Sequence, residues 1–155
     1  MKLEDKMNFP LFATLKEFII TGSNQIDVTV ADKIYQFHIL PMQNVREELG
    51  VWVTASLKSG YRPQWHERLK GRSGKSEHTY IEEWEKGSGA VDWTCKDFEE
   101  NKDRFLKLII EYTNYTRIAV YNVFIHCDYK PNGNGKRALF TSDANSYWKL
   151  DKYFD

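Results

Sequence analysis

The segment from Arg117 to Tyr129 constrains the fold of this 155-residue chain more than any other. Its central part, 118–127, is apolar at nearly every position. A strand with one exposed face alternates apolar and polar residues, whereas a strand buried on both faces is apolar throughout. We therefore predict that 117–129 contains a strand near the centre of a sheet.

Patterns with a period of two residues supply the other predicted strands. Apolar and polar residues alternate over 26–30 and again over 34–40, which predicts a β-hairpin, and the β-branched segment 51–57 predicts a third strand. Residues 137–141 follow a turn-forming stretch at 131–135 and are expected to return antiparallel. Because short connections favour antiparallel pairing, we predict a mostly antiparallel sheet of about five strands.

Helical signals flank these strands. Apolar residues at helical spacing predict a first helix near 9–20. A capping box at Thr94 predicts the main packing helix, and another at Thr79 predicts a short helix that ends near Gly87. The aromatic tail over 147–154 is expected to dock on the rest of the chain.

These elements predict one α+β domain over residues 1–155, with the helices packed on one face of the sheet. Residues 58–93 are rich in glycine and poor in aliphatic side chains. We therefore expect this range to be a long polar excursion between the third strand and the main helix, with one short helix inside it.

Composition and charge exclude several classes of protein. Lys and Arg total 22, as do Asp and Glu, so the chain lacks the overall positive charge expected of a protein that lives on nucleic acid. The residues of Met1–Lys6 alternate in charge, unlike a secretory signal, and no window approaches the roughly 18 apolar residues of a membrane span. We expect a cytoplasmic protein without membrane contact, in which Cys95 and Cys127 stay reduced.

No complete catalytic or metal-binding motif is present. Residues 71–76 carry part of a phosphate-binding loop, but Leu69 stands where that motif requires glycine. The His and Cys residues lack the short paired spacings of structural zinc sites, so no metal and no cofactor are predicted. His66 and His78, each next to a glutamate, could still form a catalytic site through folding.

The most informative feature is a separation of charge within a neutral chain. Residues 54–76 hold six basic side chains and one acidic, whereas residues 77–103 hold nine acidic and three basic. Three of the five tryptophans lie in the same region. Since Trp, Tyr and Arg dominate binding hot spots, we interpret this region as a recognition surface. The alternative is that Trp65, Trp84 and Trp93 form a small satellite core while the two charge runs neutralise each other.

The favoured hypothesis is a small protein-binding module of the inhibitor or immunity type. Such a module needs no catalytic residue, so we expect that the protein is not an enzyme. It would occlude a partner protein, for example a basic or nucleic-acid-binding enzyme. The residues predicted to form its surface are Tyr61, Arg62, Trp65, Arg68, Arg72, Lys75, Glu82, Glu83, Trp84 and Trp93.

Two alternatives belong to other classes. The basic and aromatic segment 58–76 could bind single-stranded nucleic acid, with rings stacking on bases and cations contacting phosphates, although the acidic segment that follows would repel the same backbone. The second alternative is a hydrolase with a site built from His66, Glu67 and His78.

Overall fold

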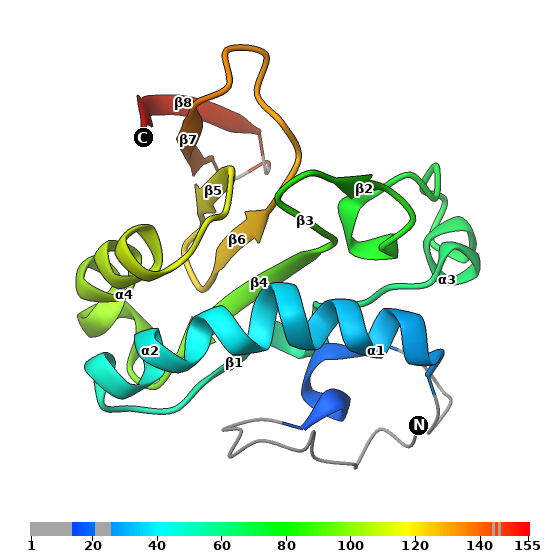
Figure 1. The fold of residues 1–155 in the computed structure, drawn as a ribbon, viewed down its shortest axis with the longest axis horizontal. Helices are drawn as coiled ribbons and strands as arrows, with labels where there is room; N and C mark the ends of the chain where they lie inside the picture. The colour runs from blue at the N-terminus through cyan, green and yellow to red at the C-terminus, as the bar shows by residue number, and fades with distance from the viewer. Residues whose placement is uncertain (1–13, 21–25, 144, 146) are drawn as a thin grey trace.

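The computed structural model describes residues 14–20, 26–143, 145 and 147–155, and these residues have an α+β fold (Figure 1). Its α-helices are α1 (Val28–Ile34), α2 (Leu40–Leu49), α3 (Gln64–Leu69) and α4 (Phe98–Tyr112). A π-helical segment, η2 (Tyr35–Ile39), joins α1 to α2, and three short 3-10 helices are η1 (Leu15–Phe18), η3 (Ser56–Lys58) and η4 (Glu77–Thr79).

Six strands form one mixed sheet in the order β1-β4-β6-β5-β7-β8. Their bounds are β1 (Val53–Ala55), β4 (Ala90–Cys95), β5 (Arg117–Val120), β6 (Ile125–Asp128), β7 (Arg137–Ser142) and β8 (Trp148–Phe154). A separate two-stranded sheet pairs β2 (Glu83–Trp84) with β3 (Gly87–Ser88).

The prediction of a mostly antiparallel sheet of about five strands is therefore wrong in two respects. The main sheet has six strands, and β7 pairs with β5 in parallel. Both edges of β6 are already occupied, by β4 and by β5. The loop at 129–136 therefore carries the chain across the start of β5, and β7 lies on the far side of that strand.

The largest correction concerns 26–40, which was predicted to be a β-hairpin and is helical. Asp27 caps α1 by accepting a hydrogen bond from the Thr29 amide at 2.8 Å. Apolar side chains then recur at steps of three to five residues on the buried side of α1, η2 and α2, and Gly50 ends α2 in the left-handed conformation. The alternation of the first few residues fits a strand, but the longer apolar stripe decides in favour of a helix. The buried members of this stripe are Ala31, Ile34, Ile39, Met42, Val45 and Leu49.

Two predicted helix starts are also wrong. Thr94 lies within β4, and α4 begins only after Asp97, which has a left-handed backbone. Tyr80, next to the predicted cap Thr79, is left-handed as well, and the chain continues into the β2–β3 hairpin. The predicted first helix near 9–20 falls partly outside the described residues, and its described part holds only η1.

Other predictions are confirmed in coarser form. The central apolar segment gives two strands, β5 and β6, joined by a turn. The main helix exists as α4, and the tail docks as β8 against β7. The supposed excursion, 58–93, is only partly peripheral, because its last residues enter the sheet in β4.

Helices α1, α2 and α4 contribute to one apolar core with the sheet. In Figure 1, α4 lies at one end of the molecule and α3 at the other, with the sheet between them. Alternation along β4 and β6 turns Val91, Trp93 and Cys127 into the core. No helix among the described residues is long and apolar enough to cross a membrane.

Candidate functional site

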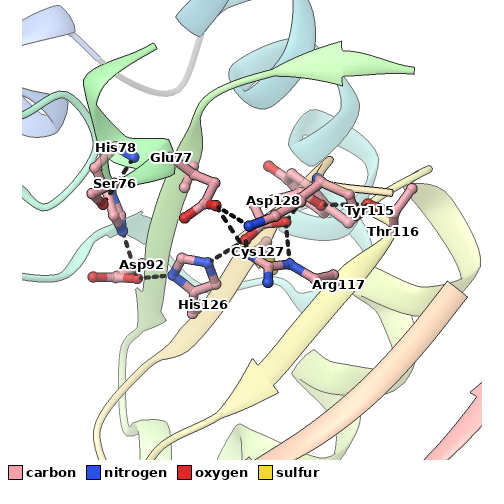
Figure 2. Close-up of polar contacts among 12 residues, drawn as sticks. Ser76, Glu77, His78, Asp92, Tyr115, Thr116, Arg117, His126, Cys127 and Asp128 are labelled. Atoms are coloured by element: carbon pink, nitrogen blue, oxygen red, sulfur yellow. Dashed lines mark hydrogen bonds and ion pairs between the residues drawn. The ribbon is translucent and has the colours of Figure 1, made fainter. Parts of the chain in front are cut away.

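The register of three adjacent strands builds a polar cluster on the sheet. Asp92 of β4 lies directly opposite His126 of β6, and Asp128 of β6 lies directly opposite Arg117 of β5. Because side chains alternate between faces, Asp92 and His126 project away from the face that Trp93 shares with the core. All of these polar groups are buried or nearly so, and Figure 2 shows them pointing toward one another.

His126 lies between two carboxylates. Its Nδ1 is 2.8 Å from Asp92 Oδ1, and its Nε2 is 2.8 Å from Asp128 Oδ2. A carboxylate can only accept, so each of these hydrogen bonds requires a proton on the imidazole. Burial opposes the charged form of His126, but the bonds to Asp128 and Asp92 outweigh it and raise the pKa of His126 to about 9.

His78 reaches the same carboxylate from η4. Its Nδ1 is 2.8 Å from the Gly60 carbonyl oxygen, which can only accept, so Nδ1 carries the proton. The opposite nitrogen, Nε2, faces Asp92 Oδ1 at 3.4 Å. The other oxygen of Asp92 accepts a hydrogen bond from Ser59 Oγ at 2.7 Å. One oxygen of Asp92 therefore lies between the two imidazoles, and the other is held by the Ser59 hydroxyl.

The carboxylates are held in the ionised state despite their burial. Burial alone would raise the pKa of Asp128, but hydrogen bonds from His126 and Arg117 bring it down to about 2. For Asp92, burial is likewise outweighed by the neighbouring His78 and His126, which keep its pKa well below the usual value. Both groups are therefore anionic at neutral pH.

Asp128 connects the cluster to a second ring of charges. Arg117 donates to both of its oxygens, at 2.9 and 2.5 Å, and the Lys130 amide donates to Oδ1 at 2.9 Å. Glu77, from η4, lies 3.4 Å from the Arg117 guanidinium and 3.5 Å from the Lys130 ammonium. Figure 2 shows Glu77, Arg117 and Asp128 next to His126. This ring of charges fixes the orientation of the imidazole through Asp128.

The cluster opens into a pocket with a volume of about 320 Å³. His78, Asp92 and His126 line it from the sheet and η4. The rest of the lining has a polar part and an aromatic part. The polar residues are Arg62, Ser76 and Glu77, and the aromatic residues are Tyr121, Phe124 and Trp148. The buried cluster is thus accessible to a small molecule or to part of a larger one.

Three side chains here can serve as ligands of one metal ion. Donor atoms of His78, Asp92 and His126 lie within 4.8 Å of one another. Two imidazoles and a carboxylate are a ligand set that proteins use for zinc and for non-haem iron, with open positions left for water or substrate. Neither this set nor its spacing was predicted from the sequence.

The structure divides the predicted surface residues among different environments. Arg62 lines the pocket, and its Nε lies 3.1 Å from Glu67 Oε1. Arg72 contacts the other oxygen of Glu67 at 2.5 Å, so this fully buried carboxylate joins two of the predicted basic residues. Four other predicted residues are exposed and take no part in the ion pairs with Glu67: Arg68, Lys75, Glu82 and Glu83.

The three tryptophans of this region do not form one cluster. Trp93 is fully buried, packs edge-on against Phe18 and donates to the Tyr115 hydroxyl, so it belongs to the main core. Trp65 is exposed on α3, and Trp84 lines a second pocket beside Tyr129. The remaining predicted residue, Tyr61, is half-buried and forms a bridge with Ile19. Whether the exposed members bind a protein or a nucleic acid stays a prediction.

The predicted pair His66 and His78 is not the cluster that forms. His78 contacts Asp92 and Gly60, whereas the His66 ring lies against Trp65 on α3. The histidine that joins His78 in the cluster is His126, not His66. One signal in the sequence pointed there: polar His126 and Asp128 alternate in an otherwise apolar strand, which places both on the same face.

Comparison with known proteins adds no further constraint. The chain matches no known family model, and neither a curated protein nor a solved structure is significantly similar to it.

Proposed function

We propose that the chain is a metal-dependent hydrolase in which His78, Asp92 and His126 bind a single zinc-like ion. One observation carries this proposal. Both imidazoles direct one nitrogen at the same Asp92 oxygen, while their other nitrogens are bonded to the Gly60 carbonyl and to Asp128. Histidines that bind metals almost always donate their second N–H to a carboxylate or a backbone carbonyl, which fixes the tautomer.

The surroundings of Asp92 support zinc over a cation that needs many ligands. Ser59 already occupies one carboxylate oxygen, so the other is the oxygen available to an ion. An ion there would replace the proton that His126 Nδ1 donates to Asp92, because a nitrogen that binds a metal must be deprotonated. Two imidazole nitrogens and one oxygen would then leave the fourth tetrahedral position open toward the pocket, as in catalytic zinc sites. A zinc ion held there would polarise a substrate carbonyl and lower the pKa of a water molecule.

The protein's own residues supply two further requirements for hydrolysis of an amide or ester, which are charge stabilisation and a fixed metal ligand. Arg62 lines the pocket and is held by Glu67, so its guanidinium is positioned to donate to negative charge that develops on a carbonyl oxygen. Asp128 accepts a hydrogen bond from His126, and Arg117 holds Asp128, so the imidazole of His126 is kept in place. The proposal keeps His78 of the predicted hydrolase site and pairs it with Asp92 and His126.

The first experiment measures metal binding by the full chain. Metal-free protein is titrated with Zn²⁺ and its bound metal is counted by mass spectrometry, with an expected stoichiometry of about one ion per chain. His78→Gln and Asp92→Asn should lose the ion, whereas His66→Ala should keep it, because His66 lies outside the cluster. Circular dichroism of each variant checks that it is folded. Absence of binding in folded wild-type protein would refute the proposal.

The second experiment measures activity against a panel of p-nitrophenyl esters and N-acyl p-nitroanilides. The comparison is between metal-free protein, the same protein reloaded with Zn²⁺, and reloaded His78→Gln. We expect hydrolysis by the reloaded wild-type protein alone. Equal rates in all three samples would show that the cluster does not catalyse the reaction.

A further inference from the structure

The pocket above the cluster has one wall made of aromatic rings. Tyr121 and Phe124 lie in the turn between β5 and β6, and Trp148 begins β8. The rings of Tyr121 and Phe124 are stacked, with centroids 4.3 Å apart and an angle of 21° between their planes. Trp148 lies beside them and donates its indole N–H to the Tyr121 hydroxyl at 2.7 Å. We call these three residues the aromatic wall.

The polar atoms of the aromatic wall are engaged with each other. The bond between Trp148 and Tyr121 uses the indole N–H of one ring and the hydroxyl of the other. The indole N–H is thereby occupied and the Tyr121 hydroxyl keeps its own hydrogen, so the wall offers ring surface with one polar group. An aromatic side chain can pack against such rings in an offset or edge-on arrangement. The pairing thus favours an apolar planar group as the occupant.

The Trp148 ring of the aromatic wall is also held in place by its neighbours. The Arg117 guanidinium lies 4.9 Å from the centroid of the Trp148 ring, and Phe140 packs against the same ring at 5.1 Å. Since Arg117 is itself fixed by Asp128, the ring has little freedom to rotate. A site whose rings are already ordered binds with a smaller loss of conformational entropy.

The distance from the aromatic wall to the cluster limits which part of a substrate can occupy it. The Trp148 ring centroid is 5.1 Å from that of the His126 imidazole. A group that rests on Trp148 is therefore within about one residue of any atom reacting at the cluster, since consecutive Cα atoms are about 3.8 Å apart. The opposite part of the lining, with Arg62, Ser76 and Glu77, is polar. Only one side of the pocket suits an apolar group.

We infer that the aromatic wall is a specificity site that binds an aromatic side chain directly adjacent to the bond hydrolysed at the cluster. The inference rests on the proposed function for the identity of that bond, but binding to the aromatic wall can be measured without catalysis. The pocket volume of about 320 Å³ is at the small end for ligand sites, which suits one side chain and its flanking amide.

The test uses nuclear magnetic resonance of the full chain with ¹⁵N-labelled tryptophan. The indole signal of Trp148 is identified by its loss in Trp148→Phe, and the protein is titrated with N-acetyl-phenylalaninamide or N-acetyl-alaninamide. We expect a saturable shift of the Trp148 signal, with the phenylalanine probe binding at least about tenfold more tightly than the alanine probe. Phe124→Ala should reduce this preference to less than about threefold, while Trp65→Ala, a change at an exposed tryptophan outside the pocket, should leave it unchanged.

The outcomes separate this inference from the proposed function. Equal affinity for the two probes, or an unchanged preference in Phe124→Ala, would overturn the specificity site whether or not the protein binds zinc. A clear preference in a protein that binds no metal would support the specificity site and refute the metal-dependent hydrolase. The zinc stoichiometry of each sample is measured in parallel, so the two results are independent.

Discussion

Asp128 is the residue through which the cluster is tied to its surroundings. It accepts from His126, from Arg117 and from the Lys130 amide. In Asp128→Asn the negative charge is lost, so His126 is oriented less firmly and becomes a weaker ligand. We expect the affinity for Zn²⁺ to fall by about 10- to 100-fold, as for other residues that support a metal ligand. Competition with a chromogenic chelator measures the change.

The matched control for this substitution is Asp103→Asn, an exposed aspartate on α4. It changes the net charge by the same amount at a distance from the cluster, and it should leave the affinity for Zn²⁺ within about twofold of wild type. An Asp128→Asn variant that is folded and binds zinc as tightly as wild type would show that Asp128 has no supporting role.

His38 should make the stability of the protein sensitive to acid. It is fully buried, donates from Nε2 to the Ser88 carbonyl oxygen and accepts at Nδ1 from the Tyr115 hydroxyl. Burial lowers its pKa from 6.5 to about 3. The unfolded chain therefore binds the proton first as the pH falls below 6.5, and stability is lost between about pH 6.5 and pH 3. Above this window His38 contributes no pH dependence.

This effect can be isolated with His38→Gln, which keeps a donor and an acceptor but does not titrate. Between pH 7.5 and pH 4.5, the wild-type protein should lose roughly 2–3 kcal/mol more free energy of unfolding than the variant. Urea denaturation at the two pH values measures both. Parallel losses in the two proteins would mean that His38 is protonated in the folded state.

At the scale of elements, the helix from Val28 to Leu49 contains a defect with a clear cause. Pro41 has no N–H, so the carbonyl of Phe37, four residues earlier, loses its α-helical donor. The backbone loosens into the π-helical segment η2 just before this point. The hydroxyl of Tyr129 donates to the Phe37 carbonyl in place of the missing amide. A loop beyond β6 thereby completes a helix far away in the sequence.

This compensation predicts a measurable coupling between two residues. Tyr129→Phe leaves the Phe37 carbonyl without that donor and should reduce the free energy of unfolding by about 1–3 kcal/mol. In a Pro41→Ala background a backbone amide is available again, so the same substitution should have a smaller effect. Chemical denaturation of the four proteins of this double-mutant cycle gives the coupling energy. Strict additivity of the two substitutions would contradict the proposed compensation.

The elements also show why only part of the fold was predictable. Helix α4 and strands β1 and β7 have strong local patterns and were located approximately, whereas the tail that forms β8 was expected only to dock. Residues 26–40 were misread because Ile26, Val28 and Val30 alternate like a strand, while the stripe that makes them helical becomes visible only when 31–49 is included. Local periodicity cannot choose between a strand and a helix when tertiary packing decides the outcome.

The cluster was less predictable than the fold for a geometric reason. His78, Asp92 and His126 come from three separate segments, with no short spacing between any two of them. Strand register brings Asp92 opposite His126, and η4 adds His78. A sequence motif records residues that are close along the chain, whereas this set is close only because β4 pairs with β6. The alternation of His126 and Asp128 was the one local sign of it.

At the scale of the whole molecule, the two faces of the sheet bury different kinds of side chain. One face packs against α1, α2 and α4 in the apolar core, and the other carries the buried charges of the cluster. Because the cluster joins β4, β5, β6 and η4, an ion bound there would link segments that are distant in sequence. Metal binding should therefore stabilise the fold as a unit.

The size of this stabilisation follows from binding linkage. With free Zn²⁺ at about 100 times its Kd, binding to the folded state alone adds about 2.7 kcal/mol to the free energy of unfolding. For a chain of this length the melting temperature should then rise by about 5–11 °C. Differential scanning calorimetry of wild-type protein with and without Zn²⁺ measures the shift, and His78→Gln should show none while His66→Ala should show the full shift. A rise of the same size in His78→Gln would place the ion elsewhere, because that variant lacks one of the three donors on which the site depends.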